Sequence, residues 1–492
     1  MPAGLARKRQ KRRIDRDGGL TETAVKGSFL KQNTYYRRYG QSAVTVNPPL
    51  SRRPPLASWD KKYLWHPFTQ QSEWAGREPI IIESAQGVWL KDFQGRRLMD
   101  GVSSLWVNVF GHRKKELDQA VKQQLAKIAH GTFLGLTHEP AIRLAERLIK
   151  LAPRGLSRVF YSDNGSTAVE VALKMAYQYW QLSGQPKKTR FVSLKEGYHG
   201  DTLGSVSVGG IELFHQRFGG LLFKGWQVPL PTSKKRGRGG FAEDAMEKVL
   251  RRRHSQIAAV ILEPLVQGAS GMRLMPKGYL SHIAALCKRY DVLLIADEVA
   301  TGFGRTGTMF AVEQEKVKPD FLCVAKSITG GYLPLAATLT TEKIYRSFLG
   351  RYDEFKAFFH GHTYTANPLA CAVALANLDL FESEKLLEHV RARTDQLAQG
   401  LSSLKNHPHV KEVRQIGLMA GIELVKDKKS ERPYPPGMRM GLKVCDVCIQ
   451  RGLWLRPLGD VVVLMPPLAI SARELAFLVE TVQQAINEAT AD

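Results

Sequence analysis

Between residues 157 and 326, short apolar runs alternate with helix-like segments, and this alternation constrains the fold more than any other feature of the 492-residue chain. We expect strands in SRVFYSD, TRFVSLKEG, IAAVILEPLVQG and DVLLIADEV, and helices in NGSTAVEVALKMAYQYWQ and GYLSHIAALCKRY. Strands joined by crossover helices form a mostly parallel sheet that is covered on both faces. The pattern therefore predicts an α/β protein.

The regions on either side of this alternation predict a smaller second domain. GVWLKDFQGRRLMDG (87–101) has the alternating pattern of a hairpin, broken at Gln94 and Gly95. From about Glu384 the pattern becomes α+β, with a strand in GLMAGIELV. We expect helices at 114–131, 139–151, 438–451 and 472–488.

These patterns divide the chain into four parts. Residues 1–55 are a basic N-terminal extension that we expect to be disordered, and residues 56–110 are a segment that joins the small domain. Residues 111–383 form the large domain, and residues 384–492 form the C-terminal small domain.

The composition indicates an ordinary globular protein. Hydrophobic residues make up 43% of the chain, and we find no run of about 18 uncharged apolar residues, so a membrane span is not expected. The five cysteines are scattered, which favours a reducing compartment over a disulfide framework. Cys445 and Cys448 form a single CxxC on a predicted helix, and we expect them to pack in the core rather than to bind a metal.

The formal net charge of +25 is concentrated near the N-terminus. Residues 1–58 hold thirteen Lys or Arg against three acidic residues, a profile that is typical of a polar tail. The clusters at 234–240 and 251–254 have no base-reading motif beside them, so we expect solvated surface and no nucleic-acid partner. The tail has no apolar core of a secretory signal. We expect a cytoplasmic protein, and an Arg-rich organellar transit peptide is the open alternative.

Asp297 and Lys326 each follow an apolar strand, at the ends of DVLLIAD and FLCVAK, so two buried strands would bring both side chains to one cleft. The pair suits pyridoxal phosphate, because that cofactor needs a lysine to hold it as an imine and a carboxylate to keep its ring nitrogen protonated. The large domain would then bind the cofactor. Each residue also has a structural alternative. Lys326 could be a surface lysine, and Asp297 could cap or pair with Arg305, although Glu298 would then have no role at the end of its strand.

A third feature of the predicted sheet is the turn DNGST (163–167), which runs from a strand directly into a helix. Such a turn offers free backbone N–H groups, the positive end of the helix and hydroxyl groups to a phosphate. Its Ser or Thr residues would equally serve as a helix cap. The turn therefore leaves capping and phosphate binding open.

Several motifs in the same order resemble the class III aminotransferases of pyridoxal phosphate fold type I. They are SDNGSTAVEVALK, DEVATGFGRTG, AKSITGGYLP and HGHTYTANPLACAVALA. Within that family, LWHPFTQ, DGVSSLWVNVFGH, GYHGDTLG, ILEPLVQGASGM and LRPLGDVVVLMPP resemble the branch that makes 7,8-diaminononanoate for biotin. The resemblance extends from about Leu56 to the C-terminus and implies a transaminase that acts on 8-amino-7-oxononanoate in two half-reactions.

The resemblance implies a role for each matching residue around the cofactor ring. Lys326 would hold the cofactor as a Schiff base and then move a proton between the substrate and the cofactor. Asp297 would pair with the ring nitrogen. Tyr198 would border the ring and Glu263 would lie behind it.

The same resemblance implies that two subunits share each active site. Gly165 and Ser166 would hold the phosphate from one subunit. His362 and Thr363 match the contact that reaches the phosphate from the second subunit. A homodimer is therefore implied.

For the substrates, the resemblance implies a channel with few polar anchors. Gly361 would line this channel beside Tyr198 and Lys326. Arg456 matches the arginine that binds the distant carboxylate of the substrate, and Arg305 is a second candidate for an anion, since a guanidinium suits a carboxylate.

The identity of the amino donor depends on residues where this chain departs from well-known relatives. Those relatives use S-adenosylmethionine and have a tyrosine, a tryptophan pair and a second tyrosine where this chain has Phe68, Leu105 beside Trp106, and Val463. Fewer aromatic faces and phenol groups suit a sulfonium less well. Family frequency favours S-adenosylmethionine as the donor, and these substitutions favour lysine.

Two rival functions remain. One is another ω-aminotransferase of the same fold, acting on ornithine, 4-aminobutyrate or a polyamine, against which the WHPF and RPLGD motifs argue. The other is a basic binding protein without catalysis, which would form no cofactor adduct on Lys326.

Overall fold

The computed structural model describes residues 55–230, 236–237, 240–241 and 245–491. The predictions for the basic extension, and for most of the cluster at 234–240, lie outside these residues. The chain divides into two compact units, residues 1–79 and 80–492. In the described part of the first unit, helix α1 (Leu56–Tyr63) and helix α2 (Gln71–Ala75) are joined through Asp60, which accepts a 2.7 Å hydrogen bond from Trp74 Nε1.

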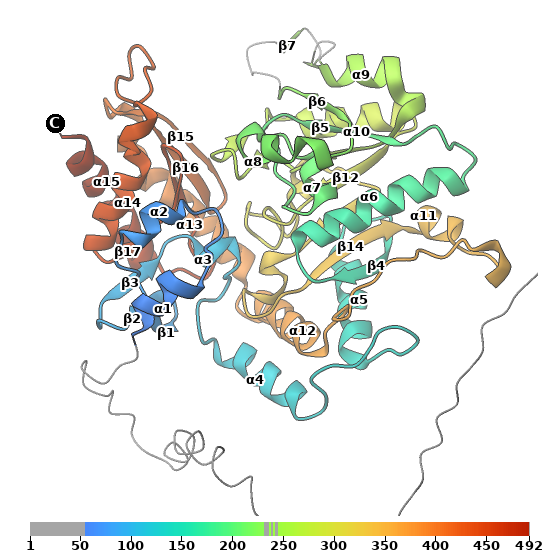
Figure 1. Cartoon of the computed structure of the whole chain (residues 1–492), viewed down its shortest axis with the longest axis horizontal. Coiled ribbons are helices and arrows are strands. Elements are labelled where there is room, and N and C mark those ends of the chain that lie inside the picture. The colour runs from blue at the N-terminus through green and yellow to red at the C-terminus, as the bar shows by residue number, and fades with distance from the viewer. Residues whose placement is uncertain (1–54, 231–235, 238–239, 242–244, 492) are drawn as a thin grey trace, which may run out of the picture. The chain divides into compact units, whose positions relative to one another are not determined.

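A seven-stranded sheet is the centre of the second unit, as Figure 1 shows. All neighbouring strands are parallel except β14, which is antiparallel to both of its neighbours. This confirms the predicted mostly parallel sheet and adds β6 and β14, which we did not predict. The strands are, in spatial order, β4 (Leu156–Ser162), β14 (Ala336–Thr341), β13 (Phe321–Val324), β12 (Leu293–Asp297), β9 (Ile257–Leu262), β5 (Arg190–Leu194) and β6 (Trp226–Val228).

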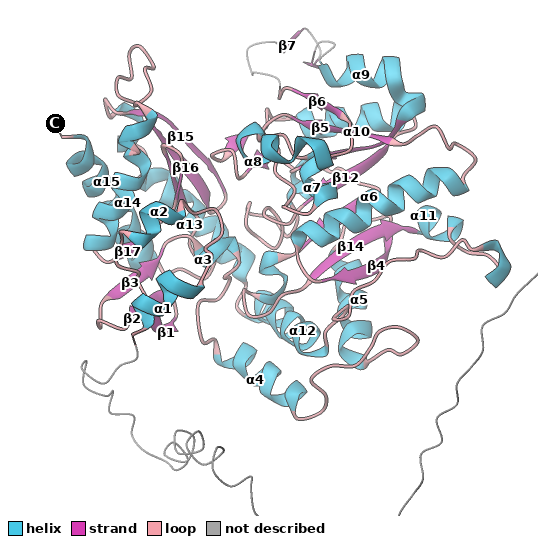
Figure 2. Ribbon diagram, in the orientation of Figure 1, coloured by secondary structure: helices cyan, strands magenta, loops and turns pink. Residues whose placement is uncertain are grey.

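Both faces of this sheet are buried, because alternate residues of its strands enter two different apolar clusters. On β12, Leu294 and Ala296 belong to one cluster, and Leu293 and Ile295 belong to the other. Helix α6 (Gly165–Leu182) covers the second face, and Figure 2 shows it lying against the strands. The first face is covered by α5 (Glu139–Leu151), α10 (Tyr279–Arg289) and α12 (Pro368–Ser383).

The C-terminal region contains a four-stranded antiparallel sheet, β15-β16-β19-β18, and shares a second four-stranded sheet with residues 82–100. Strand β17 pairs in parallel with β3, while β2 and β3 form the predicted hairpin. The strands are β1 (Ile82–Gln86), β2 (Trp89–Asp92), β3 (Arg97–Asp100), β15 (Val410–Ile416), β16 (Met419–Leu424), β17 (Leu453–Trp454), β18 (Pro457–Leu458) and β19 (Val461–Leu464). The helices are α13 (Leu386–Gly400), α14 (Met440–Gln450) and α15 (Ala472–Thr490).

The remaining elements are short and connect the sheets. The helices are α3 (Ser103–Trp106), α4 (Lys115–Leu125), α7 (Leu203–Val208), α8 (Glu212–His215), α9 (Ala245–Arg253) and α11 (Glu342–Ser347). The strands are β7 (Arg236–Gly237), β8 (Gly240–Phe241), β10 (Val266–Gln267) and β11 (Arg273–Leu274). No helix in the described part of the chain is long and apolar enough to cross a membrane.

Two predictions about helices have different outcomes. The expected helix at 114–131 ends at Leu125, because Leu125 and Ile128 are 56% and 44% exposed and their spacing does not extend a buried face.

Cys445 and Cys448 are both buried on α14 within the apolar core, where burial raises the pKa of the Cys448 thiol to about 12. The prediction that this pair packs in the core is confirmed.

Candidate functional site

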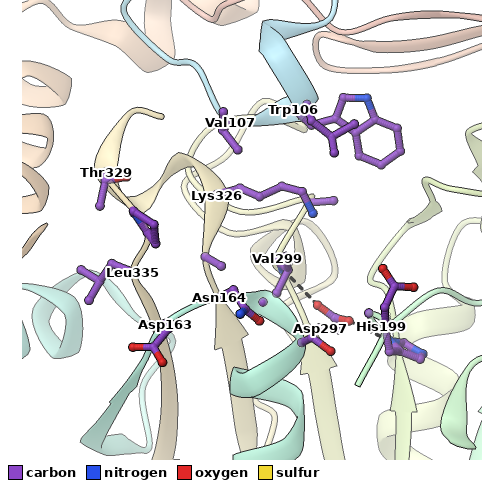
Figure 3. Close-up of a pocket in the computed structure, with 18 of the residues that line it drawn as sticks. Trp106, Val107, Asp163, Asn164, His199, Asp297, Val299, Lys326, Thr329 and Leu335 are labelled. Carbon is purple, nitrogen blue, oxygen red and sulfur yellow. Dashed lines mark hydrogen bonds and ion pairs between the residues drawn. The ribbon is translucent and has the colours of Figure 1, made fainter. Parts of the chain in front are cut away.

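A pocket of about 680 Å³ lies where strands of the central sheet end. Its lining includes Asp163 after β4, Asp297 at the end of β12, and Lys326 two residues after β13. Because parallel strands place their carboxyl ends at one edge of the sheet, residues far apart in the sequence meet here. Figure 3 shows Lys326 extending between Trp106 on one side and Val299 and Asp297 on the other.

Lys326 has an unusual backbone and an altered amine. Its φ of 47° lies in the left-handed region, which is strained for a residue with a side chain, and strained residues of this kind cluster at functional sites. Burial lowers the pKa of the amine, and the nearby Asp297 carboxylate opposes that shift. The amine lies 5.8 Å from the centre of the Trp106 ring. A lysine whose pKa is lowered is neutral, and therefore nucleophilic, in a larger fraction of molecules than an ordinary lysine at the same pH.

Asp297 is almost fully buried and is held by two contacts. Its Oδ1 atom accepts a 3.1 Å hydrogen bond from the Val299 amide, and its Oδ2 atom forms a 2.7 Å hydrogen bond with His199 Nδ1. The alternative in which Asp297 pairs with Arg305 is therefore wrong. Glu298 has a separate structural role, since its carboxylate accepts the backbone N–H groups of Ala311 and Val312.

The N-terminus of helix α6 also lines the pocket. Asn164 caps this helix, because its side-chain oxygen accepts a 3.0 Å hydrogen bond from the Thr167 N–H. The Thr167 hydroxyl oxygen in turn accepts a hydrogen bond from the Asn164 N–H. The cap is thus provided by Asn164 and Thr167, which leaves the pocket-lining Gly165 and Ser166 available for another role. The Ser166 hydroxyl is fixed by Thr202, whose N–H donates to it at 3.0 Å. This terminus can bind an anion through its backbone N–H groups.

Glu263 connects two loops behind the pocket. Its carboxylate accepts the Tyr198 N–H at 3.0 Å and the Gly268 N–H at 2.9 Å. Burial raises the pKa of Glu263 to about 7, and these two N–H groups oppose the shift. The Tyr198 hydroxyl donates a 2.8 Å hydrogen bond to Asp201. Tyr198 is thereby held at both ends, as a ring that borders a cofactor must be.

Six predicted site residues lie outside the pocket lining. Arg305 is fully buried, and its guanidinium donates to the carbonyl oxygens of Pro466 and Asn108. The structure therefore corrects the prediction that Arg305 contacts a substrate anion, because the side chain is turned into the protein and bonded to backbone. Arg456 is exposed on the segment between β17 and β18.

The other four lie on two separate segments. Gly361 and Thr363 are exposed, and His362 Nδ1 lies 2.8 Å from Asp163 Oδ2 at the edge of the pocket. Phe68 belongs to the first compact unit, where it is 57% exposed. Val463, which we expected to influence donor choice, is 1% exposed and packs in an apolar cluster that Trp106 contacts.

The sequence reasoning missed several pocket residues. His199 and Asp201 lie in the same GYHGDTLG motif as Tyr198, and both line the pocket. Their position beside a predicted ring contact was a signal for them. Val299, Thr329 and Leu335 also line the pocket, but they are ordinary residues in the sequence, and only the tertiary structure reveals them.

The groups in this pocket match pyridoxal phosphate. A phosphate fits the α6 N-terminus, a ring nitrogen fits the buried carboxylate of Asp297, and an aldehyde fits the amine of Lys326. His199 supports this fit, because its buried Nε2 atom has no hydrogen-bond partner among the described residues and its Nδ1 atom orients Asp297. In the described part of the chain, no group of His, Cys, Asp or Glu is arranged to hold a metal ion.

Comparisons with known proteins agree with this chemistry. A family model described as class-III aminotransferase matches residues 71–486. The adenosylmethionine-8-amino-7-oxononanoate aminotransferase of Geobacter sulfurreducens is 48% identical over 443 residues, which are 88% of this chain and 98% of that protein.

Two solved structures resemble most of the chain. The crystal structure of adenosylmethionine-8-amino-7-oxononanoate aminotransferase from Methanocaldococcus jannaschii is 46% identical, with a TM-score of 0.85 over 88% of this chain and 98% of that one. An omega transaminase from Pseudomonas jessenii in complex with PMP is 33% identical, with a TM-score of 0.84 over 89% of this chain and 98% of that one.

Proposed function

Since the chain belongs to the class-III aminotransferase family, we propose that it transfers an amino group to 8-amino-7-oxononanoate and so makes 7,8-diaminononanoate for biotin synthesis. One observation carries this proposal. Enzymes named for that acceptor are 46% and 48% identical over almost their whole length, whereas the ω-transaminase of the same fold is 33% identical. The ω-aminotransferase rival is therefore the second choice.

The chain's own residues would hold pyridoxal phosphate at both ends. Gly165 and Ser166 at the start of α6 would bind the phosphate, and Asp297 would face the ring nitrogen. Val299 and Tyr198 border the space between these groups. When bound, the cofactor supplies an aldehyde that takes up the amino group and a ring that delocalises the electrons released at the substrate carbon.

Lys326 would move the proton in both half-reactions. Its amine has a lowered pKa, so it can accept a proton from the donor carbon and return one to the carbon of the acceptor ketone. Its strained backbone directs the side chain into the pocket. Glu263, by holding the amides of Tyr198 and Gly268, would keep the ring's neighbours in place during this transfer.

We infer that S-adenosylmethionine is the amino donor, because both relatives carry it in their names. Lysine is a second candidate, favoured by a specific observation. Leu105 is 53% exposed in the pocket wall, where it offers an aliphatic face beside the single indole of Trp106. An aliphatic wall suits an alkyl chain better than an adenine ring.

A half-reaction assay tests this proposal. The purified protein, loaded with pyridoxal phosphate, is mixed with S-adenosylmethionine, lysine, ornithine or 4-aminobutyrate, and bleaching of the cofactor absorbance is followed. We expect bleaching with S-adenosylmethionine or lysine, recovery when 8-amino-7-oxononanoate is added, and formation of 7,8-diaminononanoate. Bleaching by ornithine or 4-aminobutyrate alone would favour the ω-aminotransferase rival. Lys326→Ala is the control for the non-catalytic rival, and it must lose both the borohydride-trapped adduct and turnover.

We also propose a homodimer with shared active sites. Phe359, Tyr364, Leu134 and Leu136 are each at least 60% exposed, more apolar surface than isolated exposed residues account for. Two of the segments that carry them touch, because the rings of His130 and Tyr364 are 4.8 Å apart. A second copy of the chain would cover this surface and bring Thr363 to the other pocket.

Mixing two variants that are each impaired at a different residue tests the shared site. Lys326→Ala lacks the nucleophile, and Thr363→Ala lacks the expected contact to the partner's phosphate. If sites are shared, a mixed dimer contains one site with both residues intact, so co-refolded subunits should regain up to about half of the wild-type activity per hybrid dimer. Activity that stays at the sum of the separate variants would contradict sharing.

We place the enzyme in the cytoplasm, and the role of the basic extension is tested directly. The full chain and a chain that begins at Leu56 are each fused to a fluorescent protein and compared for localisation and for activity. Import of the full chain alone into an organelle would show that the extension is a transit peptide and would contradict the cytoplasmic assignment.

A further inference from the structure

The loop that forms one wall of the pocket is held in a strained conformation. Leu105, Trp106 and Val107 line the pocket from the segment that follows β3. In this segment Ser103, Ser104 and Trp106 have φ values of 51°, 61° and 67°. A positive φ is unfavourable for a residue with a side chain, so the surrounding structure must impose this conformation.

Asp100 supplies the contacts that hold the loop. Its carboxylate is fully buried at the end of β3, and its Oδ1 and Oδ2 atoms accept the Ser104 N–H at 2.9 Å and 2.7 Å. The Ser104 hydroxyl donates to the same carboxylate at 3.3 Å, and His112 Nε2 lies 3.2 Å from it. Asp100 lies at the start of the loop and His112 at its end, and the two side chains contact each other. The buried carboxylate of Asp100 therefore holds both ends of the segment that contains the pocket wall.

The backbone on which Asp100 lies is itself fixed. The Asp100 N–H donates to the Val88 carbonyl at 2.7 Å, and Asp100 is paired with Trp454 across β3 and β17. On the other side of the loop, Arg305 donates to the Asn108 carbonyl, and its buried charge is favoured by Asp100. Arg305 thus reinforces the loop from behind.

We propose that Asp100 is a positioning residue that selects substrates by fixing the direction of Leu105 and Trp106. Asp100 does not line the pocket and acts through the segment that it holds, chiefly through the Ser104 N–H and also through the Val102 N–H, the Ser104 hydroxyl and His112. The inference rests on the proposed transamination, in which two different substrates bind in turn against this wall. Lys326 and Asp297 come from other strands, so loss of the Asp100 charge should alter substrate binding much more than proton transfer.

A matched pair of variants tests this role. Asp100→Asn keeps the volume of the side chain but removes the charge that accepts two bonds from Ser104. Asp92→Asn is the control, because Asp92 is equally buried in the same hairpin and its carboxylate accepts the backbone N–H groups of Gln94 and Arg96, as that of Asp100 accepts those of Val102 and Ser104, but it does not contact the pocket loop. Both variants should lower Tm. Only Asp100→Asn should raise KM for the acceptor or the donor, by about tenfold, which corresponds to about 1.4 kcal/mol, with kcat within about threefold of wild type.

A double-mutant cycle with Leu105→Ala separates positioning from general loss of stability. If Asp100 acts through the loop wall, the KM of the double variant Asp100→Asn/Leu105→Ala should be close to the KM of Leu105→Ala alone. If Asp100→Asn does not fold, His112→Ala carries the test, because it removes one contact to Asp100. A KM for that variant above that of Asp92→Asn supports the role, and an equal KM refutes it.

The proposed function is decided separately, on the wild-type protein. If the wild type uses another amine or another acceptor, the proposed reaction fails, and the same variants are compared with the substrates that it does use. If the wild type is active and Asp100→Asn matches Asp92→Asn in KM, or if the two effects in the cycle simply add, the positioning role of Asp100 is refuted.

Discussion

Replacing Gly165 with alanine should weaken cofactor binding by steric pressure on the floor of the pocket. A Cβ atom at this position would lie 2.4 Å and 2.9 Å from the two γ-carbons of Val299 and 3.3 Å from its Cβ. Since carbon atoms pack at about 3.5–4.0 Å, one side must move by about 1 Å. Val299 lines the pocket and donates its N–H to Asp297, so the movement reaches both the phosphate end and the carboxylate.

The size of this effect follows from overpacking in a closely packed site. Such insertions cost about 1–3 kcal/mol. If most of this strain appears only when the cofactor is bound, Gly165→Ala should raise the Kd for pyridoxal phosphate by about 10- to 100-fold, at about 1.4 kcal/mol per tenfold. The assay is titration of the apoprotein with pyridoxal phosphate, followed by its absorbance, together with Tm of the apoprotein and of the loaded protein.

A second substitution provides the refutation. Val299→Ala removes the two γ-carbons and leaves only the 3.3 Å contact, so the double variant should recover most of the lost affinity. Val299 is partly exposed, and Val299→Ala alone should cost only about 1 kcal/mol. Unchanged affinity in Gly165→Ala, or a double variant as weak as the single one, would show that the Gly165 contact with Val299 does not control the site.

Three further predictions concern residues near the pocket. His199→Ala should reduce turnover about tenfold or more through loss of the bond to Asp297, about 1.5–3 kcal/mol for a charged partner, whereas His199→Asn keeps a donor and should retain more activity. Burial raises the pKa of Glu298 from 4.5 to about 7, so ionisation of Glu298 lowers the free energy of unfolding as pH rises from about 4.5 to 7. Denaturant titrations of Glu298→Gln and wild type should show the difference in their free energies of unfolding shifting in favour of the variant by up to about 3 kcal/mol over this pH range. A difference that stays constant with pH would contradict the burial argument. Asn164→Ala should lower stability by about 1 kcal/mol and weaken cofactor binding, while Ser471→Ala, at the capping box of the remote helix α15, should lower stability alone.

The sequence was sufficient to predict the sheet and its two reactive residues, because both depend on local pattern. Asp297 and Lys326 each end an uncharged apolar run, and parallel strands must place those ends together. Helix α5 was predicted to the residue, since its apolar face is continuous and its ends are marked. Strand β14 was missed because it is antiparallel and follows a turn of small residues without a helix.

The direction of long side chains could not be predicted in the same way. Arg305 follows the strand that carries Asp297, and its type suggested an anion contact. The fold instead turns it inward to two backbone carbonyls, because the segments of Asn108 and Pro466 need donors that no nearby backbone group supplies. Such a role depends on residues more than 150 positions away in the sequence, which no local pattern contains.

Substrate choice also depends on contacts between residues that are distant from the reactive pair. Lys326 and Asp297 do not distinguish one amine from another, so the residues of the pocket wall must do so. Lys326 would process any amine that reaches it. The residues that sort amines, Leu105 and Trp106, face the pocket from a segment in which Ser103, Ser104 and Trp106 adopt positive φ values, which residues with side chains do not favour. That conformation is imposed by the buried charge of Asp100, through two bonds to one backbone N–H. Specificity in this protein therefore depends on Asp100, which meets no substrate, as well as on Leu105 and Trp106, and a comparison of pocket residues alone would omit Asp100.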